Sequence, residues 1–240
     1  MTLVEHIGEL RRRLIVSVVA LVITTSTVGF VLYSHILNFL REPYCRAVGA
    51  AHCKLYVTGP LDPLALRIKI ATYGGLFLAS PVILWEIWRF ITPGLRRHER
   101  RYALSFVTAS ITLFAAGAVL AYYTFPHALG FLDKVGGTSL QQIYSPNNYI
   151  GLILALMAVF GITFEFPVVL VSLELVGILK PAKLASWRRW AIVVLMAFAA
   201  IITPSGDPFS MTALAVPLYL FYEISIVIGK LLLRRRAPGA

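Results

Sequence analysis

Two acidic residues stand among arginines beside apolar segments, a pattern that is typical of a site for a cationic ligand. The stretch Phe90–Arg101 reads F-I-T-P-G-L-R-R-H-E-R-R and holds one acid, Glu99, among four arginines. Near the start of the chain, Glu9 is followed closely by three consecutive arginines. Carboxylates hold guanidinium groups through charge-assisted hydrogen bonds. We therefore predict that Glu9 and Glu99 either bind arginines of a ligand or pair locally, with Arg12 and Arg97 respectively.

A further acid, Glu165, lies within a long apolar run, two residues before Pro167. Acids at such depth are costly, and they mark function or a specific partner. Burial disfavours the charged form, so we expect Glu165 to be protonated and able to donate a hydrogen bond. On a helix it would share a small, partly polar face with Ala158, Gly161, Val168 and Ser172. This face predicts either a groove for a partner helix or a hydrogen bond to another span of the same chain.

Three other acids lie near the ends of apolar runs. We expect Glu86 and Glu174 to extend toward water at the membrane boundary, as charged side chains near span ends commonly do. Glu223 is interpreted as a packing contact whose carboxyl group is satisfied locally.

The elements that must position these residues are membrane spans. The chain has 240 residues, of which 58% are hydrophobic and only 14% are charged, and its mean hydropathy is +0.79. A soluble domain would carry about 25% charged residues. The net charge of +11 does not indicate nucleic-acid binding, because the arginines stand at the ends of apolar runs rather than along a basic stripe.

Apolar runs of spanning length predict an all-α polytopic membrane protein, with a single domain over 1–240 and six transmembrane helices in a concave bundle. The expected spans are approximately 14–33, 67–91, 102–125, 149–173, 187–202 and 209–230. Outer loops are expected over 35–66 and 126–148. Pro81 lies inside the second span and predicts a kink whose freed carbonyl group needs another donor.

The fifth and sixth spans are expected to be short. Residues 190–202 would cover about 20 Å at 1.5 Å per residue, against a hydrocarbon core of about 30 Å. Two interpretations stay open: a short helical pair that tilts beneath its neighbours, or ordinary variation in span length.

Charge decides the orientation. Most of the 22 Lys and Arg fall in the N-terminal segment, in the loops around 92–101 and 180–189, and in the C-terminal tail. Positive loops stay in the cytoplasm, so both termini are expected there. Motifs of hydrolases, zinc proteases and nucleotide-binding enzymes are absent from the sequence, so we expect no enzyme, cofactor or metal.

Both cysteines, Cys45 and Cys53, lie in the first expected outer loop. Two interpretations stay open: a disulfide in the oxidising space outside the cytoplasm, or two free thiols.

Four stretches, in order, resemble the TatC family of the twin-arginine translocase. They are E-H-I-G-E-L-R-R-R-L at the start, S-P-V-I-L-W-E-I-W-R-F-I-T-P-G-L-R-R-H-E-R-R, F-G-I-T-F-E-F-P-V, and I-T-P-S-G-D-P-F-S with A-V-P-L-Y-L-F-Y-E-I. The resemblance covers nearly the whole chain. It implies six spans in the plasma membrane of a prokaryote, with both termini in the cytoplasm, and this orientation agrees with the charge pattern.

The resemblance also assigns residues. It implies signal-peptide binding by the positions that match the family's N-terminal and first-loop motifs: Glu9, Leu10, Arg11, Arg13, Phe90, Pro93 and Glu99. It places Glu165, with Pro167, at the family's intramembrane acid, and Pro43 at a proline of the first outer loop. The two outer-loop cysteines depart from many family members.

The function implied is a receptor and core subunit that binds twin-arginine signal peptides on the cytoplasmic face. With single-span TatA and TatB partners, and with self-association in the receptor complex, it would move folded proteins across the bilayer using the proton-motive force. The alternative is a multi-pass solute or ion transporter of another family. A transporter of that kind commonly shows repeat symmetry, which the two halves of this sequence lack.

Overall fold

The computed structural model describes residues 3–48, 56–57, 59–91, 103–135 and 145–234. Within these ranges every regular element is helical, as predicted. The elements are α1 (Leu3–Thr27), a π-helical turn η1 (Val28–Leu32), α2 (Tyr33–Val48), α3 (Asp62–Ile91), α4 (Ala103–Val135), α5 (Pro146–Thr163), α6 (Phe166–Val176), α7 (Pro181–Ser186), α8 (Arg188–Ile202) and α9 (Pro208–Arg234).

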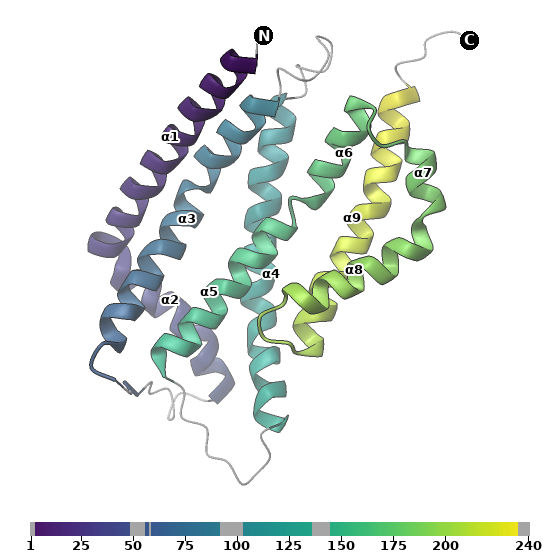
Figure 1. Ribbon diagram of the computed structural model, residues 1–240. Coiled ribbons are helices and arrows are strands. Elements are labelled where there is room, and N and C mark those ends of the chain that lie inside the picture. Colours follow the sequence, from purple (N-terminus) through teal and green to yellow (C-terminus); the bar gives the residue numbers. More distant parts are fainter. Residues whose placement is uncertain (1–2, 49–55, 58, 92–102, 136–144, 235–240) are drawn as a thin grey trace.

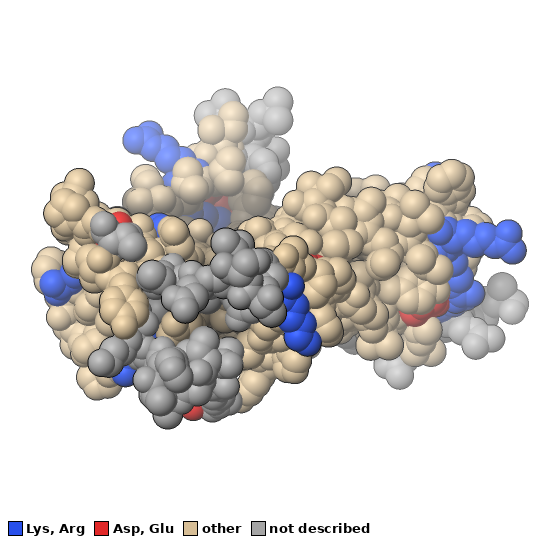
Figure 2. All heavy atoms as spheres, turned by 90° about the horizontal axis from the view of Figure 1, so that it is seen from below, with Lys and Arg blue, Asp and Glu red and all other residues tan. Residues whose placement is uncertain are grey.

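The helices run up and down along one bundle. The first turns of α1 and the last turns of α9 lie at the same end, and α2 lies at the opposite end (Figure 1). Seen from that opposite end, the surface consists mostly of uncharged residues, with Lys and Arg at scattered places (Figure 2). We refer below to the end that carries the start of α1 as the terminal end.

Five helical segments of the described chain are long and apolar enough to cross a membrane: Ile7–Cys45, Asp62–Ile91, Leu104–Leu132, Pro146–Val176 and Pro208–Leu231. The chain is therefore a multi-pass membrane protein. Helix α8 coincides with the expected fifth span but has only 15 residues, so the count of six spans stays a prediction.

The sixth expected span, 209–230, coincides with the apolar segment Pro208–Leu231, which is shorter than the other four segments. Helix α9 has 27 residues. It begins sharply because the Asp207 carboxylate accepts a hydrogen bond from the backbone N–H of Ser210 at 2.7 Å, and Pro208 follows directly. An aspartate cap and a proline in the first turn are favourable at a helix start.

The expected loop over 35–66 is wrong in its first part, because residues 33–48 form α2. Leu40 and Tyr44 are buried on one face of this helix. Pro43 lacks an N–H group and leaves the carbonyl oxygen of Phe39 without its helical donor. The Tyr122 hydroxyl group of α4 donates to that oxygen at 3.1 Å. Tertiary packing and a tyrosine donor thus maintain a helix that the proline and the polar residues seemed to exclude.

The second expected outer loop is also shorter than predicted, because α4 continues through Pro126 to Val135. Ala128 and Leu129 are buried in this extension. Burial of this apolar face compensates for the proline within the helix.

The carbonyl group that Pro81 leaves without a donor finds a new donor within the same helix. Proline removes the donor for the carbonyl oxygen of Phe77, four residues earlier. The Ser80 hydroxyl group donates to that oxygen at 2.8 Å, so the same helix supplies the replacement.

Close helix packing depends on glycine at two crossings. A Cβ atom at Gly75 of α3 would lie 2.6 Å from the Cα atom of Thr25 in α1, and one at Gly117 of α4 would lie 2.6 Å from the carbonyl oxygen of Phe160 in α5. Side chains longer than hydrogen would force these backbones apart. The first crossing joins the C-terminal part of α1 to the middle of α3, and the two helices meet again nearer the terminal end, where Arg13 pairs with Glu86.

Candidate functional site

A polar cluster lies between α1 and α3 near the terminal end. Helix α1 begins at Leu3, so Glu9 and Arg13 stand one turn apart on the same face. Glu86 comes from the last two turns of α3. Helices α1 and α3 pack against each other, and these side chains meet across the two helices.

Arg13 is held between the two acids. Its Nη1 atom lies 3.2 Å from Oε2 of Glu86. Its Nε atom donates to Oε1 of Glu9 at 3.1 Å, and its Nη2 atom donates to the same oxygen. Only 14% of the Arg13 side chain is exposed, against 22% for Glu9 and 13% for Glu86. A guanidinium group is thus already bound where the sequence predicts guanidinium recognition.

The cluster lines a cavity of about 260 Å³. We call it the arginine pocket, and its lining residues are Glu9, Arg12, Arg13, Val16, Glu86 and Arg89. Two carboxylates and three guanidinium groups share this space. Such a pocket can hold planar cations by charge-assisted hydrogen bonds.

The structure brings some of the expected recognition residues together but not all. Glu9 pairs with Arg13 rather than with Arg12, which was the local alternative. Leu10 and Arg11 are exposed on α1, and Phe90 is half-buried near the end of α3. Pro93, Glu99 and Arg97 lie outside the described residues, so their part in the site stays a prediction.

Glu86 was missed as a site residue. We expected it to extend toward water, but its side chain is largely buried and pairs with Arg13, 73 residues earlier in the chain. A signal was present in the sequence: Glu86 precedes Phe90 by one helical turn, so both lie on one face of the second span.

A second polar group surrounds Glu165, where the helix is interrupted. Helix α5 ends at Thr163 and α6 begins at Phe166, so the carboxyl group lies at the break. On α4, the Ser110 hydroxyl group accepts a hydrogen bond from Nε1 of Trp88 at 2.7 Å and lies close to the Glu165 carboxyl group, whose Oε1 atom has no hydrogen-bond partner among the described residues. Glu165 itself is half-buried.

The small face beside Glu165 is not an open groove. Gly161 packs so closely on the Phe114 ring of α4 that a Cβ atom would lie 2.9 Å from it, and Ala158 is buried. The other two members of the face, Val168 and Ser172, are buried as well. This face is filled by the chain itself, so a partner would approach Glu165 from another side.

The remaining acids have different neighbours. Glu174 is fully buried instead of reaching water, and its carboxyl group packs against Gly229 of α9. Glu223 forms an ion pair with Nη2 of Arg188 at 2.7 Å and accepts a hydrogen bond from the Tyr219 hydroxyl group. As expected, the carboxyl group of Glu223 finds its partners nearby.

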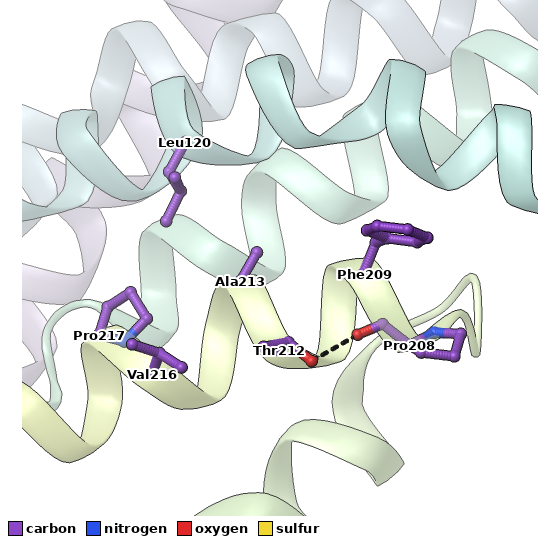
Figure 3. Close-up of a pocket in the computed structure, with 7 residues that line it drawn as sticks. All are labelled: Leu120, Pro208, Phe209, Thr212, Ala213, Val216 and Pro217. Carbon is purple, nitrogen blue, oxygen red and sulfur yellow. Dashed lines mark hydrogen bonds between the residues drawn. The ribbon is translucent and has the colours of Figure 1, made fainter.

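A larger, apolar groove lies where α9 starts. It encloses about 550 Å³ and is lined by Leu120 of α4 and by Pro208, Phe209, Thr212, Ala213, Val216 and Pro217 of α9 (Figure 3). Its one hydroxyl group, on Thr212, donates to the carbonyl oxygen of Pro208 at 2.7 Å. The groove therefore offers apolar contact and no side-chain charge.

The outer-loop positions are only partly visible. Pro43 is buried within α2, and its role there is the exchange of hydrogen bonds described above. Cys45 is half-buried in the same helix. Cys53 lies outside the described residues, so the disulfide stays a prediction. In the part of the chain that is described, no group of three His, Cys, Asp or Glu residues could hold a metal ion.

Comparisons with known proteins agree on one family. The family model described as Sec-independent protein translocase protein (TatC) matches residues 5–217. A Sec-independent protein translocase protein TatC of Frankia casuarinae is 42% identical, covering 99% of this chain and 68% of its own length. The TatC protein of Aquifex aeolicus is 41% identical over 98% of both chains.

The fold comparison leads to the same family. A crystal structure of a twin arginine translocase receptor, TatC, superposes with a TM-score of 0.78 at 39% identity, covering 94% of this chain and 98% of that one. These matches exclude the alternative of a solute transporter from another family. The chain belongs to the TatC family, whose members are components of the Sec-independent protein translocase and not enzymes.

Proposed function

We propose that this chain is the receptor subunit of a twin-arginine translocase and that it binds the paired arginines of signal peptides at the arginine pocket. The observation that carries the proposal is the guanidinium group of Arg13, held by Glu9 and Glu86 in a largely buried pocket between α1 and α3. The same two carboxylates can hold a guanidinium group of a peptide. Glu99, with Phe90 and Pro93, would complete the site from the loop that follows α3.

The binding test uses the full chain in lipid nanodiscs and a fluorescent twin-arginine peptide followed by anisotropy. Glu9→Gln keeps the size of the side chain and removes its charge. A charge-assisted pair contributes about 1.5–3 kcal/mol, so we expect an affinity about tenfold to a hundredfold lower. Glu99→Gln should act in the same direction.

The matched control is Glu42→Gln in α2, an exposed acid at the opposite end of the bundle. It removes the same charge far from the pocket and should leave the affinity within about twofold, since exposed charges at that separation are screened. Equal affinities of the wild type, Glu9→Gln and Glu99→Gln for the twin-arginine peptide would remove both acids from the site.

We propose that the terminal end faces the cytoplasm and that α8 is the fifth of six spans. The arginine runs at positions 11–13 and 234–236 support this orientation. In a variant without native cysteines, a cysteine replacing Lys180 should react with an impermeant thiol reagent only from the cytoplasmic side. A cysteine replacing Leu61, exposed in the segment before α3, should react only from outside. The reverse pattern would overturn the orientation.

We propose further that single-span TatA and TatB partners contact the chain at Glu165 and that cargo transport uses the proton-motive force. The carboxyl group at a helix break, next to a hydroxyl group on α4, supports a hydrogen-bonding role. Glu165→Gln should keep partner crosslinking while Glu165→Ala loses it. If proton movement is the role, the Gln variant should assemble but fail in transport. Normal assembly and transport by the Ala variant would contradict both versions.

A further inference from the structure

All three nitrogen atoms of the Arg13 guanidinium group contact an acid. Its Nε and Nη2 atoms donate to Oε1 of Glu9, and its Nη1 atom lies 3.2 Å from Oε2 of Glu86. This is how an arginine of a ligand would be held, because planar forks of N–H donors match carboxylate oxygens. The described pocket therefore already contains an arginine, and that arginine belongs to the receptor.

The charges in the arginine pocket leave no surplus of negative charge for a ligand. Two acids face three arginines within a cavity of about 260 Å³. Arg12 and Arg89 line it without a hydrogen bond or ion pair to any residue that the structure describes. A peptide with two arginines would add two positive charges to this space. Like charges so close together repel, and more strongly in a partly buried site than in water.

We propose that Arg13 is a built-in competitor of the signal peptide, so that an arginine of the peptide displaces Arg13 from Glu9 and Glu86, and that Glu86 is a second recognition carboxylate. This inference rests on the proposed function and adds to it the regulation of the same pocket. Arg13 has a long flexible stem at a position near the start of α1, so it can leave the acids without unwinding the helix.

Displacement lowers the apparent affinity for every peptide that needs the two acids. Peptide binding must first release the Arg13 pairs, and the apparent dissociation constant rises by the inverse of the fraction of receptor in the released state. A peptide guanidinium group restores the same forked hydrogen bonds. A lysine ammonium group is a point charge that cannot match them. Competition by Arg13 therefore weakens both peptides by the same factor, and the preference for the twin-arginine peptide comes from the hydrogen bonds of its guanidinium groups.

The test compares Arg13→Gln with Arg89→Gln in the full chain in nanodiscs, using twin-arginine and twin-lysine peptides. Both variants remove one positive charge from the pocket, but only the first releases the acids. We expect Arg13→Gln to bind both peptides about tenfold more tightly and to keep the preference for the twin-arginine peptide. Arg89→Gln should raise the affinity for both peptides equally, by about threefold or less.

Two further variants keep the outcome decisive. Glu86→Gln should lower the affinity for the twin-arginine peptide about tenfold, both in the wild type and in the Arg13→Gln background. Where Arg13→Gln does not fold, as judged by thermal unfolding in detergent, Arg13→Lys replaces it. The Lys variant keeps the charge but lacks the planar fork of donors. We expect it to show the same changes in affinity, smaller in magnitude.

Equal effects of Arg13→Gln and Arg89→Gln, or weaker peptide binding in Arg13→Gln, would overturn the displacement. Unchanged affinity in Glu86→Gln would remove Glu86 from the site. Each of these results leaves the proposed receptor function intact as long as the wild type still prefers the twin-arginine peptide. A wild type that binds neither peptide would overturn both proposals.

Discussion

The α1–α3 crossing at Gly75 controls both stability and the arginine pocket. We consider the substitution Gly75→Ala. The added Cβ atom would lie 2.6 Å from the Cα atom and 2.7 Å from the backbone nitrogen of Thr25, whereas ordinary contacts of a Cβ atom are 3.4–4 Å. The nearest atom is the Thr25 hydroxyl oxygen, and the next two belong to the backbone of α1, so rotation of the Thr25 side chain alone does not relieve the contact and the two helices must separate by about 1 Å.

Overpacking of this kind costs about 1–3 kcal/mol. For a chain of this size it corresponds to a melting temperature lower by about 2–12 °C, which thermal unfolding in detergent measures. Separation should also break the hydrogen bond that the Thr24 hydroxyl group donates to the carbonyl oxygen of Gly75 at 2.8 Å. Because Glu9 and Glu86 lie on the separated helices, affinity for the twin-arginine peptide should fall as well.

Gly130→Ala in α4 is the matched control. A Cβ atom there would have no heavy atom within 4 Å, and alanine in a helix is more favourable than glycine by about 0.5–1 kcal/mol. Its melting temperature should stay equal or rise. Equal melting temperatures and peptide affinities for the two variants would refute the reasoning, since steric contact is what distinguishes them.

Two further outcomes concern polar contacts between helices. Trp88→Phe keeps a ring that stacks on Phe106 but removes the N–H group that donates to Ser110 at 2.7 Å. The free energy of unfolding, measured by denaturant titration, should therefore fall by about 1 kcal/mol. No change would mean that the hydrogen bond is not formed. Glu223→Gln removes the ion pair with Arg188, whose side chain is 49% exposed, so the loss should stay below about 1 kcal/mol in the same titrations, and a larger loss would show that this pair is shielded.

Hydropathy predicted where helices cross the membrane because the bilayer demands long apolar runs. It failed where burial came from within the protein. Helix α2 carries polar residues and Pro43, and it is helical because Tyr122 donates to the carbonyl oxygen that the proline leaves free. The donor lies 83 residues from its acceptor. Nothing in the local sequence reveals that contact.

The arginine pocket shows the same limit. Residue types identified Glu9 as an acid among cations, and the family resemblance added Arg13. The third member, Glu86, becomes part of the site only when α1 and α3 lie together. Their approach depends on Gly74 and Gly75, where a Cβ atom would meet Val28 at 2.9 Å and the backbone of Thr25 at 2.6 Å. A glycine pair in a span indicates close approach, but it does not say which helix approaches.

The position of an acid along an apolar run also failed to predict its surroundings, because the neighbouring helix decides which group each carboxyl group contacts. Glu86 and Glu174 had the same expected position near a span end. The first meets the Arg13 guanidinium group, and the second meets Gly229, with no hydrogen-bond partner for either of its oxygens in the part of the chain that is described. Glu223 meets an arginine too, but Arg188 is far more exposed than Arg13. Water competes for a guanidinium group at that surface and weakens the pair. Among the described acids, Glu9 and Glu86 share one guanidinium group in a largely buried place, so water competes less for the Arg13 pairs than for the pair at Arg188.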